Sequence, residues 1–251
     1  MTEQEKDLMQ PLFVRGGYYD CPKDPEGIRM GPMVGYAGLG ANGLQKVGDK
    51  YFDYSTIEGT VHNEAFAAVI AKAVFKELNP ESVVVYGMPM GGIYLAGEVA
   101  RWLRFYTEAE AAFMEKKVTA LATESIREQS ILSFGRYAPK PGQKILLCDD
   151  VFNNGTTTGL AIDMFEEAGA EVIGILCAIN RSWPSITAYE RKGDKPAVAI
   201  IAGVTLPTEQ WEQSDPKVAS DLKRFPLVKK PKMARKELQK IMADLMYGQV
   251  T

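Results

Sequence analysis

Residues 144–158 read KILLCDDVFNNGTTT, and this stretch decides the fold of the chain. Residues 145–148 form a short apolar run without charge, which is typical of a strand buried on both faces. Asp149 and Asp150 close the run, a polar stretch with one glycine follows, and a helical pattern runs from about 158 to 168. In open α/β sheets, a strand followed by a polar loop and then a helix forms a phosphate site at the carboxyl end of the strand.

The polar loop and the acidic pair suit different chemical groups. Backbone N–H groups of the loop and of the first helical turn can bind an anion, and Gly155 permits a bend that a side chain would obstruct. Carboxylates repel phosphate, but Asp149 and Asp150 suit sugar hydroxyls or a hydrated divalent cation that escorts a phosphate. The combination predicts a sugar-phosphate site. The alternative for the acidic pair alone is a helix N-cap or a solvated turn.

The same stretch resembles the phosphoribosyl-pyrophosphate (PRPP) signature of type I phosphoribosyltransferases. Their loop usually reads Thr-Thr-Gly or Thr-Ala-Gly, where this chain has Asn-Asn-Gly. The resemblance implies that Asp149 and Asp150 are catalytic residues that hold the ribose hydroxyls and Mg²⁺. It also implies a PRPP-binding loop formed by Asn153, Asn154, Gly155, Thr156 and Thr157.

A second strand, glycine loop and helix unit covers residues 82–103. Residues 82–86 read as a buried strand, the loop spans 87–92, and a helix is predicted from about 93 to 103. Another anion can therefore bind at this helix N-terminus. The resemblance places the pyrophosphate loop here, with backbone amides and no lysine, and implies PRPP contacts from Met88, Pro89, Met90 and Gly91. The alternative is a plain strand-to-helix turn that needs glycine for tight packing.

The next segment supplies the candidate cations. Residues 111–114 are apolar and resemble the family's third strand, whose basic end contacts pyrophosphate; Lys116 and Lys117 stand there in this chain. Residues 118–137 are polar and poorly periodic, and the resemblance implies a mobile loop that closes over the active site. The family's loop lysine is missing, so either Arg127 or Arg136 is expected to replace it, or the loop has a reduced role. The alternative is that Lys116 and Lys117 lie on a solvated surface. The resemblance also allows these lysines to supply positive charge across a dimer interface, as in relatives.

Two further stretches resemble the base site of orotate phosphoribosyltransferases. Residues 46–54 read as a cation, a tight turn and an aromatic strand, and the resemblance places Lys46, Tyr51 and Phe52 near the pyrimidine. Arg181, after the apolar strand predicted at 171–178, falls where those enzymes place an arginine that meets the base. The alternatives are a hairpin with an aromatic core face and an ordinary surface arginine.

Composition excludes several classes of function. The single histidine, His62, removes most histidine-dependent zinc and triad schemes. Residues 38–43 match a dinucleotide fingerprint by letter, but no apolar helix follows, so a turn is predicted. The net charge of −3 argues against a surface that binds nucleic acid throughout. Three cysteines without close spacing, no membrane-length apolar run and no signal region predict a cytoplasmic protein with reduced thiols.

The resemblance, together with alternating strands and helices, predicts an α/β protein with the type I phosphoribosyltransferase fold, an open and mostly parallel sheet flanked by helices. A small N-terminal extension and hood is expected at 1–60, the core at 61–205, and a basic, helical C-terminal extension at 206–251. That extension is expected to pack on the domain or on a partner subunit.

The implied activity is transfer of the phosphoribosyl group of PRPP to orotate, giving orotidine 5′-monophosphate and pyrophosphate, as in pyrimidine biosynthesis. Mg²⁺ is the implied cofactor, and a homodimer is expected because relatives are commonly dimers. Two alternatives stay open. One is a phosphoribosyltransferase for another base, of the purine type. The other is a non-catalytic regulator that keeps a PRPP-like pocket and binds nucleic acid through its basic tail.

Overall fold

The computed structural model describes residues 1–40, 42–120 and 129–247. Within it the chain forms two compact units. The core unit comprises Glu58–Arg181 and Ser185–Leu206.

The second unit, here called the terminal unit, comprises Met1–Ile57, Ser182–Pro184 and Pro207–Thr251. Most residues of the predicted N-terminal region, 1–60, and of the predicted C-terminal region, 206–251, belong to this terminal unit.

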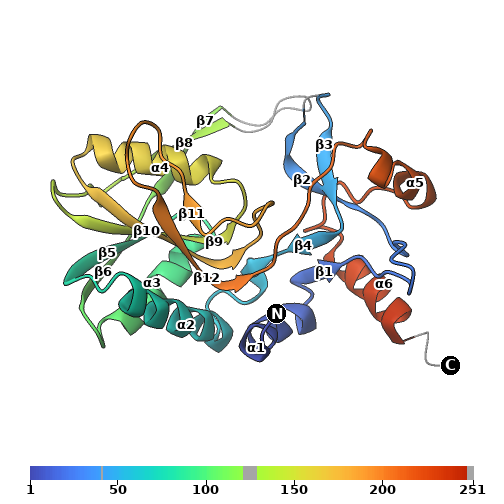
Figure 1. The fold of residues 1–251 in the computed structure, drawn as a ribbon, viewed down its shortest axis with the longest axis horizontal. Coiled ribbons are helices and arrows are strands. Elements are labelled where there is room, and N and C mark those ends of the chain that lie inside the picture. Colours follow the sequence, from blue (N-terminus) through green and yellow to red (C-terminus); the bar gives the residue numbers. More distant parts are fainter. Residues whose placement is uncertain (41, 121–128, 248–251) are drawn as a thin grey trace. The chain divides into compact units, whose positions relative to one another are not determined.

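The core unit is built on a six-stranded sheet, in the order β11-β12-β10-β9-β5-β6 (Figure 1). Its strands are β5 (Ser82–Gly87), β6 (Glu108–Phe113), β9 (Lys144–Phe152), β10 (Glu171–Asn180), β11 (Ala188–Tyr189) and β12 (Val198–Thr205). All neighbouring strands pair in parallel except the edge strand β11, which is antiparallel to β12. The predicted open, mostly parallel sheet is confirmed, and parallel order brings the carboxyl ends of β5, β9 and β10 to one edge.

Helices cover both faces of this sheet. They are α2 (Val61–Glu77), α3 (Gly92–Leu103) and α4 (Thr156–Glu167). α2 and α3 pack on one another and on one face, and α4 lies on the other (Figure 1).

The alternation of side chains along β9 explains this layering. Ile145 and Leu147 belong to the apolar cluster that contains Phe165 of α4, and all four residues 145–148 are at most 1% exposed. The predicted strand buried on both faces is therefore present.

A two-stranded hairpin stands outside the main sheet. β7 (Glu115–Ala120) pairs with β8 (Gln129–Ser133) in antiparallel register. β7 includes residues 118–120 and β8 includes residues 129–133, so parts of the loop expected at 118–137 are strands. Backbone pairing forms these strands without a regular apolar alternation in the sequence, and Leu132 packs on the apolar cluster that contains Phe165 of α4.

The terminal unit contains two two-stranded sheets, β1 with β4 and β2 with β3. Its elements are α1 (Glu3–Val14), β1 (Tyr18–Asp20), β2 (Val34–Leu39), β3 (Gln45–Gly48), β4 (Lys50–Phe52), η1 (Tyr54–Thr56), α5 (Pro216–Arg224) and α6 (Arg235–Tyr247). The alternative of a hairpin over 46–54 is not what the structure has, because β3 and β4 pair with different strands. Asp49, between them in the sequence, is buried and forms ion pairs with Lys23 and Arg29.

The basic C-terminal segment completes the terminal unit. Val228 bridges to Val34 of β2, and Trp211 bridges to Val47 of β3. Leu238 of α6 is buried in the same apolar cluster as Tyr19. The segment therefore packs on its own chain, as one of the two expectations for it states. Of the described helices, none is both long and apolar enough to cross a membrane.

Candidate active site

The acidic pair lies within the carboxyl end of β9. The strand continues to Phe152, four residues beyond the predicted end, because its pairing with β10 continues through Cys177↔Asp149 and Asn180↔Phe152. The backbone N–H of Asp150 donates to Oδ1 of Asp149 over 2.9 Å. Gly155 then caps α4 in the left-handed region, at φ 71°, which is the reason for a glycine at this position.

The glycine loop after β5 packs directly on this strand end. The Met88 N–H donates to the Cys148 carbonyl over 2.7 Å. A Cβ on Gly92 would collide with that same carbonyl, and a Cβ on Gly91 would collide with the Asp150 carboxyl group. The two loops predicted from the sequence to bind PRPP are therefore held against one another by glycines that permit backbone contact.

The amides of the glycine loop divide into two groups. Those of Gly92 and Ile93 donate within the loop, to the Met88 carbonyl (3.1 Å) and the Met90 carbonyl (3.3 Å). For the amides of Met90 and Gly91, the described part of the chain provides no hydrogen-bond acceptor. These two N–H groups are the donors that the loop can offer to an anion.

Asn154 shapes the loop before α4. Its Oδ1 accepts hydrogen bonds from the Thr156 N–H (3.2 Å) and the Thr156 hydroxyl (3.1 Å). Thr156 and Thr157 are exposed, and Asn153 and Gly155 are more buried. The helix N-terminus thus faces solvent with a threonine-rich first turn, which suits an anionic ligand.

Electrostatics at the acidic pair favours a cationic partner. Burial raises the pKa of Asp149 well above its ordinary value, and the neighbouring Asp150 charge raises it further. A cation or a positively charged sugar beside the pair would stabilise the ionised carboxylates and so act against the rise in the Asp149 pKa.

The donor set also fits Mg²⁺. Across the described ranges, no group of three or more His, Cys, Asp or Glu side chains could cage a metal by itself. Mg²⁺ is commonly held by one or two carboxylates together with substrate phosphates, and Asp149 and Asp150 supply such a pair.

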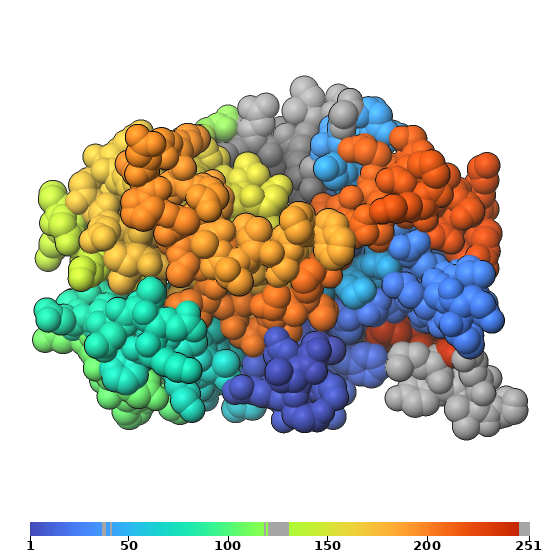
Figure 2. Space-filling view, viewed as in Figure 1, coloured from blue at the N-terminus to red at the C-terminus, as the bar shows by residue number. Residues whose placement is uncertain are grey.

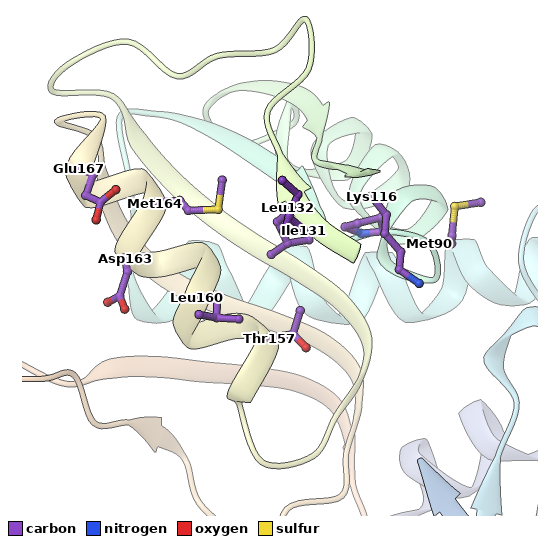
Figure 3. A pocket seen from close by; sticks show the side chains of 10 residues that line it. Met90, Lys116, Ile131, Leu132, Thr157, Leu160, Asp163, Met164 and Glu167 are labelled. Carbon is purple, nitrogen blue, oxygen red and sulfur yellow. The ribbon is translucent and has the colours of Figure 1, made fainter. Parts of the chain in front are cut away.

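A cavity of about 690 Å³ lies between α4 and the β7–β8 hairpin (Figure 3). Its lining includes residues from three predicted site segments: Lys116, the loop residues Pro89 and Met90, and Thr157. Lys116 therefore lies beside both loops. The other lining residues are Ile131, Leu132, Leu160, Asp163, Met164 and Glu167.

The three remaining candidate cations differ from Lys116. Arg136 is exposed, lies over the Tyr137 ring at 6.0 Å from its centroid, and does not line this cavity. Lys117 is exposed, lies opposite Ile131 in the hairpin, and does not line this cavity. Arg127 lies outside the described residues.

The predicted base-binding residues divide between the units. Lys46 is exposed on β3, while Tyr51 is half-buried and Phe52 buried on β4, all in the terminal unit. The Phe52 ring stacks on Tyr18 with centroids 5.3 Å apart, so it contributes to the core of that unit.

Arg181 directly follows β10 in the core unit. It is 7% exposed, unlike an ordinary surface arginine at a strand end, and its N–H donates to the Phe152 carbonyl over 2.9 Å. This bond ties the arginine to the strand that carries the acidic pair.

Beyond Thr157, the outer face of α4 carries cavity residues that were not predicted from the sequence. Thr157, Leu160 and Met164 line the cavity at spacings of three and four residues, a helical periodicity that the sequence carries. Ile131 and Leu132 of the hairpin face them (Figure 3).

The phosphoribosyl transferase domain model matches residues 59–208. The chain belongs to this family. Membership confirms the predicted family, the fold and the class of enzyme, a phosphoribosyltransferase.

Similar proteins carry more specific names. The chain is 27% identical over 147 residues to an orotate phosphoribosyltransferase of Rhodopseudomonas palustris (strain BisB5), covering 56% of this chain and 74% of that protein. It is 30% identical over 116 residues to an orotate phosphoribosyltransferase of Novosphingobium aromaticivorans, covering 46% and 53%. The crystal structure of orotate phosphoribosyltransferase from Aeropyrum pernix matches with a TM-score of 0.50 and 18% identity, covering 79% of this chain and 93% of that one, and supports the fold.

Proposed function

We propose that this phosphoribosyltransferase uses PRPP and orotate, forming orotidine 5′-monophosphate and pyrophosphate. The observation that carries the proposal is the contact of Asp150 with Gly91, which joins the acidic pair, the glycine loop and the strand leading to α4. The curated relatives named orotate phosphoribosyltransferase support orotate as the base. Mg²⁺ as cofactor, a homodimer and a cytoplasmic location belong to the same proposal.

The reaction separates charge at the anomeric carbon of the ribose. The bond from this carbon to the pyrophosphate oxygen breaks, and its electron pair leaves with pyrophosphate. A ring nitrogen of orotate forms the new bond to this carbon and loses its proton to pyrophosphate or solvent. Asp149 and Asp150 hold the ribose hydroxyls, and their negative charge stabilises the positive character that the sugar acquires. Burial and the Asp150 charge raise the pKa of Asp149, and positive charge on the sugar would act against both and favour the ionised carboxylate.

The leaving group requires donors and positive charge. The amides of Met90 and Gly91 face pyrophosphate, and Lys116 supplies a cation from the adjacent hairpin. Bound Mg²⁺, held by Asp149 and Asp150, would neutralise charge on the departing oxygens.

The 5′-phosphate and the base fix the substrates in place. Asn153 to Thr157 bind the phosphate at the N-terminus of α4, so that attack by the base becomes nearly intramolecular. In the core unit, buried Arg181 at the end of β10 is the proposed contact of orotate. Lys46, Tyr51 and Phe52 of the terminal unit are proposed as base-binding residues on the resemblance alone.

Pyrophosphate release from PRPP tests the proposal when it is measured with orotate, uracil, adenine and hypoxanthine in turn. Release with orotate that depends on Mg²⁺ is expected. The variants Asp149→Asn and Asp150→Asn should lose activity, whereas the control Glu171→Gln, at the amino end of β10, should keep it. Release with a purine instead would assign another base, and no release together with salt-sensitive RNA binding would favour the regulator.

A further inference from the structure

A short segment of the core unit lies along one face of α4. Residues 187–196, here called the strap, include β11 and follow the antiparallel register Ala188↔Ala199 and Tyr189↔Val198. Figures 1 and 2 show the strap, in orange, against the yellow helix.

Ion pairs fasten the strap to the middle and end of α4. Lys192 Nζ lies 2.8 Å from Asp163 Oδ2, and Arg191 Nη1 lies 2.8 Å from Glu166 Oε1. Lys195 also pairs with Glu166. Glu166 and Arg191 are both largely shielded from solvent, so their pair holds a fixed geometry better than an exposed one would.

Tyr189 makes the corresponding contact at the beginning of the helix. A Cβ on Gly155 would lie 2.5 Å from Cε2 of Tyr189 and 3.2 Å from Cζ of Phe152. A Cβ on Gly159 would collide with the Tyr189 hydroxyl. Positions 155 and 159 lie one turn apart on the same helix face, so the tyrosine ring spans the first turn of α4.

This contact bears on the phosphate loop because Gly155 sets its direction. Gly155 has φ 71° at the N-cap, and the conformation of this residue determines where the N–H groups of Thr156 to Thr158 point. The rings of Tyr189 and Phe152 both lie in contact distance of the position that a side chain at Gly155 would occupy.

We infer that Tyr189 is a positioning residue for the 5′-phosphate of PRPP, acting through the backbone of Gly155 and Gly159. The inference rests on the proposed function, since it names what the loop at the start of α4 binds. The absence of a side chain at Gly159 is what permits the approach of Tyr189.

Titration calorimetry of the 251-residue chain with ribose 5-phosphate tests the inference without requiring turnover. Tyr189→Ala is expected to weaken binding by about tenfold, and Tyr189→Phe, which keeps the ring, should bind nearly as the parent protein does. Steady-state kinetics should show the same rise in KM for PRPP, with KM for orotate unchanged. The matched control Tyr106→Ala removes an aromatic ring that stacks on Phe75 and should leave affinity unchanged.

Gly159→Ala provides a second test should Tyr189→Ala fail to fold. Alanine favours a helix more than glycine does, but its methyl group would collide with the Tyr189 hydroxyl. A purely structural role for this contact therefore predicts a change in stability alone, with unchanged affinity for ribose 5-phosphate. Displacement of Tyr189 predicts weaker binding of ribose 5-phosphate instead.

Two results would overturn the account in different places. If the parent protein binds neither ribose 5-phosphate nor PRPP, the proposed function fails, and this inference fails with it. If the parent protein binds them and the Tyr189→Ala or Gly159→Ala variant binds equally well, or if Tyr106→Ala weakens binding as much, only the inference about Tyr189 is wrong.

Discussion

The carboxyl group of Asp150 lies directly against the backbone of Gly91, in the space that any side chain at position 91 would occupy. Through this contact, two strand-to-helix loops from different parts of the chain form one surface. The acidic end of β9 and the amides of Met90 and Gly91 can therefore meet the same ligand. The contact depends on glycine, because no other residue leaves this space open.

Gly91→Ala should lower kcat/KM for PRPP by on the order of 100-fold, because the new methyl group must displace either the loop or the Asp150 carboxylate from its position. Gly97→Ala is the matched control, since a Cβ at Gly97 of α3 meets nothing within 4 Å. Steady-state kinetics and the melting temperature would be measured for both variants. Equal activity of the two would contradict the importance of the contact.

Asp149→Asn should lower the activity and, at alkaline pH, raise the melting temperature. Burial and the Asp150 charge raise the pKa of Asp149, so the folded protein binds this proton more tightly than the unfolded chain. Parent stability therefore falls as pH rises from the unfolded-state pKa to the raised folded-state pKa. The variant lacks this loss and should melt higher than the parent at about pH 8, but not at about pH 3. Activity should fall by on the order of 100-fold.

Asp49→Asn should show the opposite pH dependence. Burial alone would raise the pKa of Asp49, but Lys50, Lys23 and Arg29 offset this and leave the pKa below its ordinary value. The carboxylate therefore stabilises the fold above the unfolded-state pKa, and this stability is lost as pH falls through the folded-state pKa.

Urea unfolding measures that effect. At about pH 7 the loss for Asp49→Asn should be about 3 kcal/mol, the scale for breaking a buried ion pair, and it should vanish in acid. Glu209→Gln removes the more exposed pair with Lys217 and should change the unfolding free energy by less than about 1 kcal/mol. An equal loss in both variants would show that Asp49 behaves as a surface charge.

Lys116→Ala and Lys117→Ala form a matched pair of neighbours. Lys116 lines the cavity beside Thr157 and Met90, whereas Lys117 does not. Lys116→Ala should lower kcat by on the order of 100-fold through the loss of positive charge near pyrophosphate, and Lys117→Ala should have a much smaller effect. Single-turnover kinetics would isolate the chemical step. A larger loss for Lys117→Ala would reverse the assignment.

The core of the fold was predictable because its signals are local. The apolar run at 145–148 and the glycine loop at 87–92 each carry a strand-to-helix pattern that tertiary contacts leave intact. The end of β9 was less predictable, because Asp149 and Asp150 are polar residues kept in the strand by pairing with β10.

The remaining features depend on partners that are distant in sequence. β3 and β4 read as one hairpin, yet β4 pairs with β1, near the beginning of the chain. Tyr189 carries no signal that links it to Gly155, since the antiparallel strand β11 brings them together. The contact between the Asp150 carboxyl group and the Gly91 backbone likewise arises because β5 and β9 are neighbours in the sheet.

The most direct test of the central claim is the formation of orotidine 5′-monophosphate from PRPP and orotate with Mg²⁺, measured for the parent protein and for Asp150→Asn. The account predicts product in equal amount to the pyrophosphate released by the parent, and a loss on the order of 100-fold in the variant. No orotidine 5′-monophosphate from the parent at saturating substrates, or undiminished formation by Asp150→Asn, would contradict it.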